Sequence, residues 1–251
     1  MAIKPRSSKE LELMRKSGQI SAKALKKTLE AAKVGVNLKQ LDKIAEEEIL
    51  RLGGEISFRT VPGYRWSTCL TVNDEVVHGV PREEVVLKQG DVLGIDLGVI
   101  YKGWHTDTAW SVVVEKEANE FLKVGEQALW EGIEKCVEGN HIGDISEAIQ
   151  KRVEGYGYSI SRSLIGHGVG RELHEDPEVP GYGKAGTGLF LEAGMTLAIE
   201  VIYIAGKGDV ELAQDGWTYV SSDHSTGGLF EMTVVVGKEK PEVLTNPFSS
   251  S

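Results

Sequence analysis

The feature that most constrains this chain is an internal repeat whose two copies both end on an acidic residue. The pattern Leu-x-x-Gly-x-x-Leu-x-Ile-Asp occupies residues 87–96, and the same pattern with a final Glu occupies residues 191–200. A His-x-x-Pro segment precedes each copy, at 78–81 and 174–177. Helical patterns also come before the strand-like segments of both halves. We therefore predict a duplicated α+β unit whose two halves bring their acidic residues to one central site.

Apolar periodicity and turn residues divide the chain into helical and strand-like segments. Helices are predicted over 7–52, with a break at 35–37, and over 117–136 and 142–156. Strands are predicted over 69–72, 75–77, 92–100, 106–114, 159–163, 195–205, 210–213, 218–221 and 229–236. We expect a single catalytic domain over residues 1–251, which includes the N-terminal helical segment 7–52, and a frayed tail over 245–251.

Composition narrows the class of protein. Apolar residues make up 41% and charged residues 26% of the chain, as in soluble globular proteins. No apolar run approaches the ~18 residues of a membrane helix, and the N-terminus is too polar for a signal peptide. A formal charge of −10 argues against a direct nucleic-acid function. Two cysteines, Cys69 and Cys136, are read as reduced thiols of a cytoplasmic protein.

Asp96 lies in a segment that is too apolar for a solvated strand. Alternation places it between two glycines on one face, while leucine, isoleucine and valine occupy the other face. If the following turn is centred between residues 101 and 102, Asp96 lies directly opposite Asp107. Two buried carboxylates this close need a shared proton, a basic partner or a metal ion. The alternative is that both acids lie on an outward, solvated face of the sheet.

Glu200 and Glu231 repeat this situation, since each is a single acid among strong β-formers. His167 lies in the glycine-rich segment 165–170, which brings its imidazole close to whatever it binds. A phosphate-binding loop is the competing interpretation of this segment, but no Lys-Ser/Thr pair follows it. One histidine with four carboxylates fits a site for two divalent cations that activate a water molecule. Lone histidines are more often structural, and we keep that interpretation for His105, His141 and His224.

These residues resemble the motifs of the methionine aminopeptidases, in particular the short type I proteins of bacteria. The resemblance extends from about Ser8 to Thr245. It implies the pita-bread fold, in which two pseudo-symmetric α/β halves surround a central antiparallel sheet. It also implies removal of the N-terminal methionine from nascent proteins and peptides, with a preference for small second residues. The similar segments are Asn73–Pro81, Gly94–Asp96, Thr106–Thr108, Gly166–Pro180, Ile199–Glu200 and Phe230–Glu231.

The resemblance further implies a role for particular residues. Two divalent ions, of Co²⁺, Mn²⁺, Fe²⁺ or Zn²⁺, are expected, with Asp107 and Glu231 bridging them. The implied metal ligands are Asp96, Asp107, His167, Glu200 and Glu231. The implied catalytic residues are His78, His174 and Glu200. The substrate is expected to contact Phe58, Tyr64, Cys69, His78, Leu173, His174 and Trp217.

Some positions depart from the pattern of that family. The segment 58–64, which contains Val61, lacks the usual Gly-Tyr/Phe-His-Gly-Tyr run. Leu229 replaces the usual glutamine, and Met232 stands where histidine is frequent. None of these residues is an implied metal ligand. The departures therefore bear on the pocket and on turnover and leave the metal site intact.

Two other functions are compatible with the same residues. An Xaa-Pro aminopeptidase or dipeptidase shares the fold and the five ligands but usually carries an additional N-terminal domain. A non-catalytic peptide-binding module on this scaffold typically loses ligands, whereas all five are present here. For partners, we expect nascent polypeptides with an N-terminal methionine, no nucleic acid and no membrane. We expect a monomer and leave an association with the ribosome open.

Overall fold

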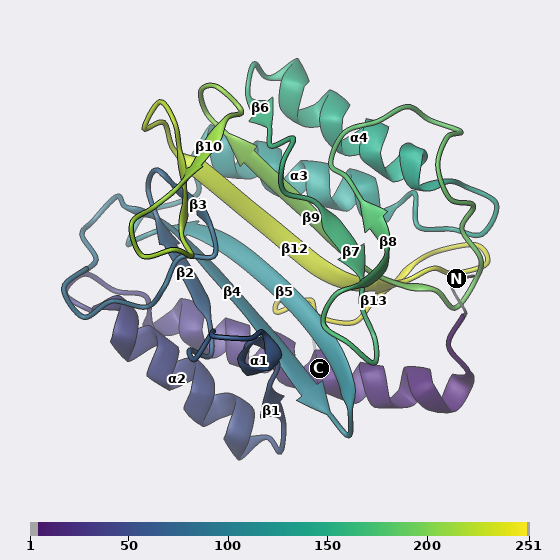
Figure 1. Ribbon diagram of the computed structural model, residues 1–251, viewed down its shortest axis with the longest axis horizontal. Helices are drawn as coiled ribbons and strands as arrows, with labels where there is room; N and C mark the ends of the chain where they lie inside the picture. The colour runs from purple at the N-terminus through teal and green to yellow at the C-terminus, as the bar shows by residue number, and fades with distance from the viewer. Residues whose placement is uncertain (1–4, 250–251) are drawn as a thin grey trace.

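The computed structural model describes residues 5–249 and shows two halves that each begin with two helices followed by strands. Figure 1 shows one half below the other, each with its helices beside its own strands. The first half contains α1 (Ser8–Ala31), α2 (Leu38–Arg51), β1 (Glu55–Ile56), the 3₁₀ turn η1 (Phe58–Thr60), β2 (Cys69–Val72), β3 (Glu75–Val77), β4 (Val92–Tyr101) and β5 (Trp104–Val113). The second half contains α3 (Glu120–Ile133), α4 (Ile142–Gly155), β6 (Ser159–Ile160), β7 (Gly166–Gly168), β8 (Glu175–Val179), β9 (Thr196–Ile204), β10 (Val210–Leu212), β11 (Tyr219–Ser221), β12 (Gly227–Val235) and β13 (Glu242–Val243).

The main sheet crosses both halves in the order β1-β4-β5-β12-β9-β7-β8. All of its pairings are antiparallel, as predicted. Helix α1 packs on β4 and β5, and α3 packs on β9 and β12. A small second sheet, β10-β11-β3, lies beside the main one. The central strands β5 and β12 therefore meet at the boundary between the halves.

The repeat extends well beyond the acidic pattern. Helices α2 and α4 both contain 14 residues and start 104 positions apart. The residues before them, Asn37 and His141, form matching isolated bridges to Val86 and Phe190. The edge pairings of β1 with β4 and of β6 with β9 also correspond at this offset. The predicted duplication is therefore confirmed in the backbone.

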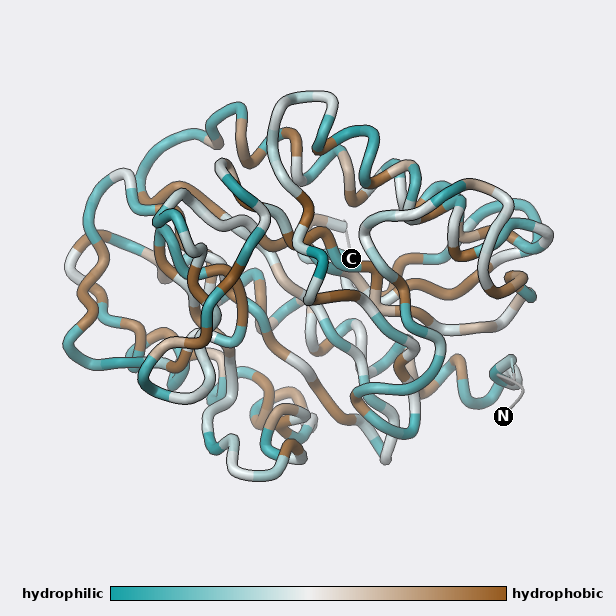
Figure 2. Tube along the Cα trace, turned by 45° about the horizontal axis from the view of Figure 1, so that its top comes forward, coloured by the Kyte–Doolittle hydropathy of each residue, from teal (hydrophilic) through white to brown (hydrophobic). Residues whose placement is uncertain are grey.

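The core forms because the strands alternate and the helices are amphipathic. Leu93, Ile95, Leu97 and Val99 of β4 are all fully buried against the helical layer. Figure 2 shows the apolar residues running along the central strands and the inner sides of the helices, while most connecting loops are hydrophilic. Burying one such aliphatic side chain contributes about 1.5–3 kcal/mol. The opposite face of β4 is thereby left for Asp96 and its neighbouring glycines.

The predicted hairpin register is wrong by two residues. The turn residues are Lys102 and Gly103, which both have positive φ, at 51° and 75°. Tyr101 therefore pairs with Trp104, and Asp107 lies opposite Gly98 instead of opposite Asp96. A two-residue turn of this kind follows the twist of the flanking strands, which favours it over the centring that we expected. Asp96 and Asp107 still share one face, but as diagonal neighbours.

The two halves are joined in an unusual way at β5 and β12. The ladder pairs only Ala109 with Glu231 and Thr108 with Met232. On one side of this short ladder, the Thr233 hydroxyl accepts from the backbone N–H of Asp107, at 2.9 Å, and donates to its carbonyl, at 2.8 Å. On the other side, the Ser111 hydroxyl does the same for Leu229, at 3.1 and 2.8 Å. Side-chain hydroxyls thus replace direct ladder bonds at this seam.

Several predicted boundaries shift by a few residues, and the tail differs more. The helix predicted over 117–136 spans 120–133, and the strand predicted over 159–163 is confined to 159–160. The expected fraying from residue 245 is wrong for Thr245, which is buried and accepts a hydrogen bond from the Thr233 N–H at 3.0 Å. Residues 250–251 of that tail lie outside the described residues. Among residues 5–249, the chain has no helix of the length and apolarity that crossing a membrane requires.

Candidate metal centre and active site

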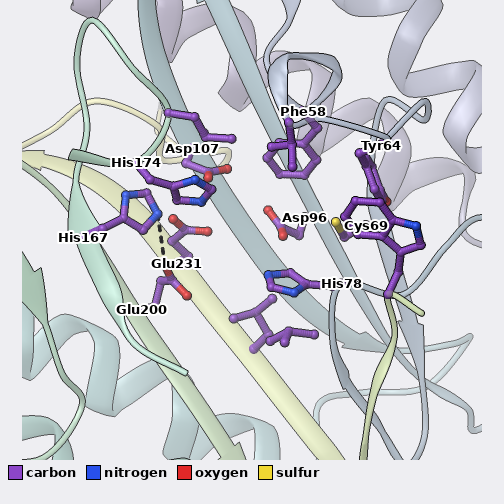
Figure 3. Close-up of a pocket in the computed structure, with 15 residues that line it drawn as sticks. Phe58, Tyr64, Cys69, His78, Asp96, Asp107, His167, His174, Glu200 and Glu231 are labelled. Carbon is purple, nitrogen blue, oxygen red and sulfur yellow. Dashed lines mark ion pairs between the residues drawn. The ribbon is translucent and has the colours of Figure 1, made fainter. Parts of the chain in front are cut away.

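One pocket opens on the polar face of the main sheet, where the two halves meet. Figure 3 shows most of the carboxylates and imidazoles at one side of it and aromatic rings at the other, with Asp96 and His78 between them. Every predicted site residue lines this pocket, and Val61, Val77 and Leu229 complete its wall. The lining residues are Phe58, Val61, Tyr64, Cys69, Val77, His78, Asp96, Asp107, His167, Leu173, His174, Glu200, Trp217, Leu229 and Glu231.

Strand register explains why four acids from distant parts of the chain converge. Asp96 on β4 pairs with Ala109 on β5, Ala109 pairs with Glu231 on β12, and Glu231 pairs with Glu200 on β9. These residues therefore form one row across four strands. Asp107 lies two residues along β5 from Ala109 and so presents its side chain on the same face. Ala109 leaves room in the row because its side chain is a single methyl group.

The carboxylates of this row are buried without enough partners. Asp96 is 9%, Asp107 4% and Glu231 2% exposed. Among the described residues, Asp96 Oδ1 and Glu231 Oε1 have no hydrogen-bond partner. Burial and the neighbouring acids raise the pKa of Asp96 and of Glu231 well above their ordinary values, and burial raises the pKa of Asp107 to about 7. Such a group of acids requires protons or a cation to offset its desolvation and mutual repulsion.

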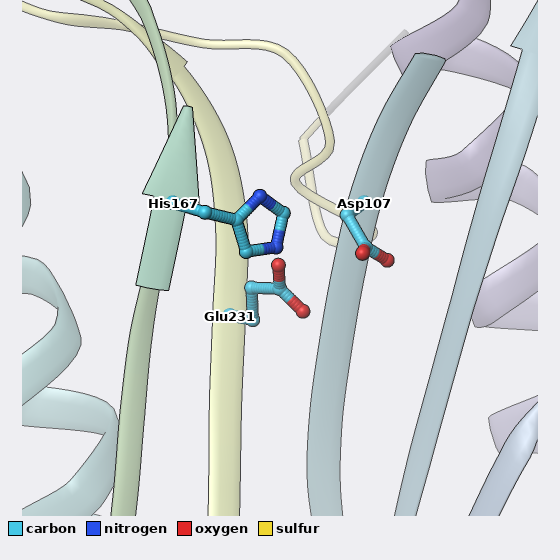
Figure 4. A group of neighbouring side chains, drawn as sticks. All are labelled: Asp107, His167 and Glu231. Carbon is cyan, nitrogen blue, oxygen red and sulfur yellow. The ribbon is translucent and has the colours of Figure 1, made fainter. Parts of the chain in front are cut away.

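His167 completes a donor set that fits a divalent cation. Its Nδ1 donates to the Gly168 carbonyl at 2.9 Å, which directs Nε2 toward the acids. Nε2 lies 3.3 Å from Glu200 Oε1. Burial disfavours protonation of His167, but Glu200 and Asp107 outweigh it and raise its pKa to about 9. One ligand atom each from Asp107, His167 and Glu231 lies within 4.8 Å of the others, so an ion can replace the shared protons. Figure 4 shows these three side chains as neighbours.

His78 and His174 stand beside the acids without joining them. The His174 ring centroid lies 4.5 Å from that of His167, in an edge-to-face arrangement. Desolvation in the pocket and the charge of His167 lower the pKa of His174 below its ordinary value, so its imidazole is neutral at pH 7 and offers one N–H donor. His78 has a positive φ of 57° and packs edge-on against Tyr219. Both side chains face the pocket and remain accessible.

The other side of the pocket is apolar. Phe58, Tyr64, Cys69 and Leu173 are buried together, with Trp217 packed against them. Tyr64 contacts Phe58 and Trp217 edge-on, with centroid distances of 6.3 and 5.1 Å, and its hydroxyl donates to the Thr68 carbonyl at 2.7 Å. This arrangement leaves an apolar space of polarisable walls directly beside the carboxylates.

A buried carboxylate fixes the segment that leads into this apolar side of the pocket. One oxygen of Asp42 on α2 accepts hydrogen bonds from the backbone N–H groups of Ser67 and Thr68 and from the Thr68 hydroxyl, at 2.8–2.9 Å. This fixes the segment that leads into Cys69. Sequence reasoning missed Asp42, because its position in the helical pattern is that of an ordinary surface acid. Val77 was also missed, and a three-residue strand gives no signal for which wall it lines.

Four residues discussed above lie outside the reacting groups. Met232 is fully buried in the core, so its departure from the family pattern does not touch the pocket. His105 is buried, with Nδ1 2.8 Å from the Ser57 hydroxyl, and His224 pairs with Asp74. His141 precedes α4 as its N-terminal cap residue. The contacts of His105 and His224 are those that the structural interpretation predicts.

Comparison with known proteins shows similarity over nearly the whole length of the chain. A family model described as metallopeptidase family M24 matches residues 12–238. The methionine aminopeptidase of Clostridium acetobutylicum is 40% identical over 239 residues, which cover 94% of this chain and 96% of that protein. Methionine aminopeptidase 1 of Bacillus subtilis is 38% identical over 243 residues, or 96% and 98% of the two chains.

Solved structures confirm the fold. The crystal structure of methionine aminopeptidase from Thermotoga maritima matches with a TM-score of 0.94 and 38% identity, over 97% of this chain and 99% of that one. Prolidase from Pyrococcus furiosus matches with a TM-score of 0.78 and 21% identity, but this chain covers only 66% of it. The predicted pita-bread fold and the resemblance to methionine aminopeptidases are thereby confirmed. The chain belongs to metallopeptidase family M24, among its methionine aminopeptidases.

Proposed function

We propose that this protein removes the N-terminal methionine from nascent polypeptides and peptides by metal-assisted hydrolysis, favouring small second residues. The observation that carries this proposal is one pocket in which five side chains of metal-ligating type face an apolar recess. This recess is formed by Phe58, Tyr64, Cys69, Leu173 and Trp217. The donor side is suited to a free amine and a peptide carbonyl. The apolar side is suited to an unbranched thioether side chain. A free N-terminal amine held at the donor side would restrict cleavage to the first residue of a chain.

We further propose that the site holds two divalent ions. Five donors supply more oxygen and nitrogen ligands than one tetrahedral ion needs. Asp107 and Glu231 lie on the two central strands, which places them between the halves and favours bridging roles. Asp96, His167 and Glu200 would then complete the two ligand sets. When bound, such ions lower the pKa of a coordinated water and polarise a substrate carbonyl. The mixed donors are compatible with Co²⁺, Mn²⁺, Fe²⁺ and Zn²⁺.

The chain's own residues supply the remaining chemistry. Glu200 is the proposed proton carrier, which accepts a proton from the attacking water and gives it to the leaving amine. It is less buried than Asp96 and Glu231, and its position opposite Glu231 keeps it at the donor row. His174 is proposed to donate a hydrogen bond to the oxyanion that develops from the carbonyl. His78, at the opposite wall, is proposed to orient the substrate amide.

The competing functions receive less support. The similarity to prolidase is one of fold, at 21% identity, and a third of that protein has no counterpart here. A non-catalytic module would not need a complete set of five buried donors. The wall residues Val61 and Leu229 contribute apolar surface to the pocket. Such walls are suited to the apolar, polarisable side chain of methionine.

Metal dependence is the first test. Protein stripped with a chelator should lose activity on Met-Ala-Ser and regain it with Mn²⁺ or Co²⁺. Asp107→Asn removes one of the bridging oxygen charges, so we expect lower metal occupancy and lower activity together. Asp209→Asn, an equal change of charge at an exposed site, is the matched control. An Asp107→Asn protein that binds metal and cleaves like the parent contradicts the ligand assignment.

The substrate is tested with a panel of peptides. We expect fast cleavage of Met-Ala and Met-Gly peptides, slow cleavage of Met-Lys peptides and no cleavage of acetyl-Met-Ala. Apolar pockets discriminate weakly, so methionine should exceed leucine by only about 1–3 kcal/mol in kcat/KM. A preference for Ala-Pro over Met-Ala peptides would replace this proposal by the proline-directed one.

For its localisation and oligomeric state, we propose a cytoplasmic monomer, consistent with two free and buried thiols.

A further inference from the structure

The loop that carries His174 is held by a contact from the start of the chain. This loop, residues 170–175, connects β7 to β8 and places both Leu173 and His174 in the pocket. Arg171 and Glu172 within it are exposed. A loop of this kind needs anchors to hold an imidazole in place, since misplacement by about 1 Å can cost a hundredfold in rate.

Glu175 closes the loop on itself. Its Oε1 accepts hydrogen bonds from the backbone N–H groups of Arg171, at 2.6 Å, and Glu172, at 3.0 Å. Its other oxygen, Oε2, accepts from the guanidinium of Arg6. The Arg6 and Glu175 side chains are only 16% and 19% exposed. Charge-assisted bonds with this little solvent contact are stronger than those of ordinary surface pairs.

Arg6 is itself fixed from several sides. Its Nε donates to the Thr196 hydroxyl at 3.2 Å, and that hydroxyl donates to the Val169 carbonyl at 2.6 Å. Its backbone N–H donates to the Gly194 carbonyl at 2.8 Å. The guanidinium lies 5.4 Å from the centroid of Trp104 and against Gly170, where a Cβ would come within 2.3 Å of it. These contacts tie the segment before α1 to both ends of the His174 loop.

We propose that Arg6 and Glu175 are positioning residues for His174. They hold the loop in the conformation in which His174 and Leu173 face the pocket, and they do not touch the substrate. The inference rests on the role proposed above for His174. It adds that turnover depends on Arg6, which is far from His174 in the sequence.

The test compares this ion pair with a second one, which Arg15 of α1 makes with Glu242. Arg6→Gln and Glu175→Gln break the pair, and Arg15→Gln is the matched control. Arg15 binds Glu242 with two bonds of 2.6 and 2.8 Å, far from the pocket. For each metal-saturated protein, kcat and KM on Met-Ala-Ser, the melting temperature and the rate of trypsin cleavage after Arg171 are measured.

We expect Arg6→Gln and Glu175→Gln to lower kcat about ten- to a hundredfold with a smaller change in KM. The double variant should lose no more than the worse single variant, because both act through one contact. Arg6→Lys keeps the charge but not the second hydrogen bond, so it should restore part of kcat. Cleavage after Arg171 should become faster in the first two variants and stay unchanged in Arg15→Gln.

Three outcomes overturn the inference. The first is a kcat like that of the parent in Arg6→Gln and Arg6→Lys, whatever the melting temperature. The second is unchanged trypsin cleavage after Arg171 in both charge-removing variants. The third is an equal loss of kcat in Arg15→Gln, which would indicate a general loss of stability. His174→Ala, assayed in parallel, separates the two proposals, because a normal kcat there refutes the role of His174 while the cleavage rates still report on the loop.

Discussion

Gly98 offers a way to disturb the apolar recess without substituting any residue that lines it. A Cβ on Gly98 would lie 2.9 Å from Phe58 Cε1 and 2.8 Å from Ser57 Cβ. Ordinary contacts of this kind start at 3.4 Å, so the Phe58 ring must move by at least about 0.5 Å, toward the recess. Gly98 has no positive φ, so an alanine there meets a packing problem and no backbone strain.

The size of the effect follows from that overlap. One extra methyl in a packed site costs about 1–3 kcal/mol. If about 1.4 kcal/mol of this is expressed in the recess, kcat/KM for Met-Ala-Ser falls about tenfold in Gly98→Ala. The rest appears as a lower melting temperature, by about 2–4 °C for each kcal/mol in a chain of this size.

Gly94→Ala is the control for this prediction. Gly94 lies on the same face of β4, equally far from Asp96, and its Cβ would meet the Thr71 hydroxyl at 2.4 Å. This substitution should lower the melting temperature but change kcat/KM by less than about twofold, because no recess residue moves. If Gly98→Ala keeps the parent's kcat/KM while losing stability as Gly94→Ala does, Phe58 does not form the methionine recess.

Two further predictions concern stability alone. Arg51 and Lys27 lower the pKa of the Glu48 carboxyl from 4.5 to about 2, so this group stabilises the fold above pH 4.5 and its contribution is lost as the pH falls toward 2. Glu48→Gln should therefore lower the melting temperature at pH 7, with a gap to the parent that narrows at pH 3; a gap independent of pH would contradict this. Tyr203→Phe removes the buried hydrogen bond from Tyr203 to the Phe121 carbonyl, 2.7 Å long, and should cost about 1–3 kcal/mol in the free energy of unfolding by urea.

Much of the site could be predicted because its signals are local in the sequence. An acid between two glycines in an apolar strand, such as Asp96, can hardly be solvated, and the same argument applies to Glu200 and Glu231. The repeat then predicts that Asp96 and Glu200 occupy equivalent places in the two halves. What could not be predicted is register. A lysine with positive φ, as at Lys102, is uncommon, and a turn at Lys102 and Gly103 in place of Tyr101 and Lys102 shifts every pairing in the hairpin by two.

The residues that hold the site in place could not be predicted from the sequence either. Asp42 and Arg6 each act on segments far along the chain, at Thr68 and Glu175. Nothing in the local pattern around either residue distinguishes it from a solvated charge on a helix. Such contacts depend on the three-dimensional arrangement of elements that are distant in the sequence, which periodicity does not specify.

The hydroxyl seam between β5 and β12 has a consequence for the proposed metal centre. Asp107 belongs to one half and Glu231 to the other, so the gap between their carboxylates depends on how far apart the two strands are held. Thr233 and Ser111 act as spacers at this point, each inserting one oxygen atom where two backbones would otherwise meet directly. The two hydroxyl groups thus set the distance between the Asp107 and Glu231 carboxylates, although neither hydroxyl is a proposed metal ligand.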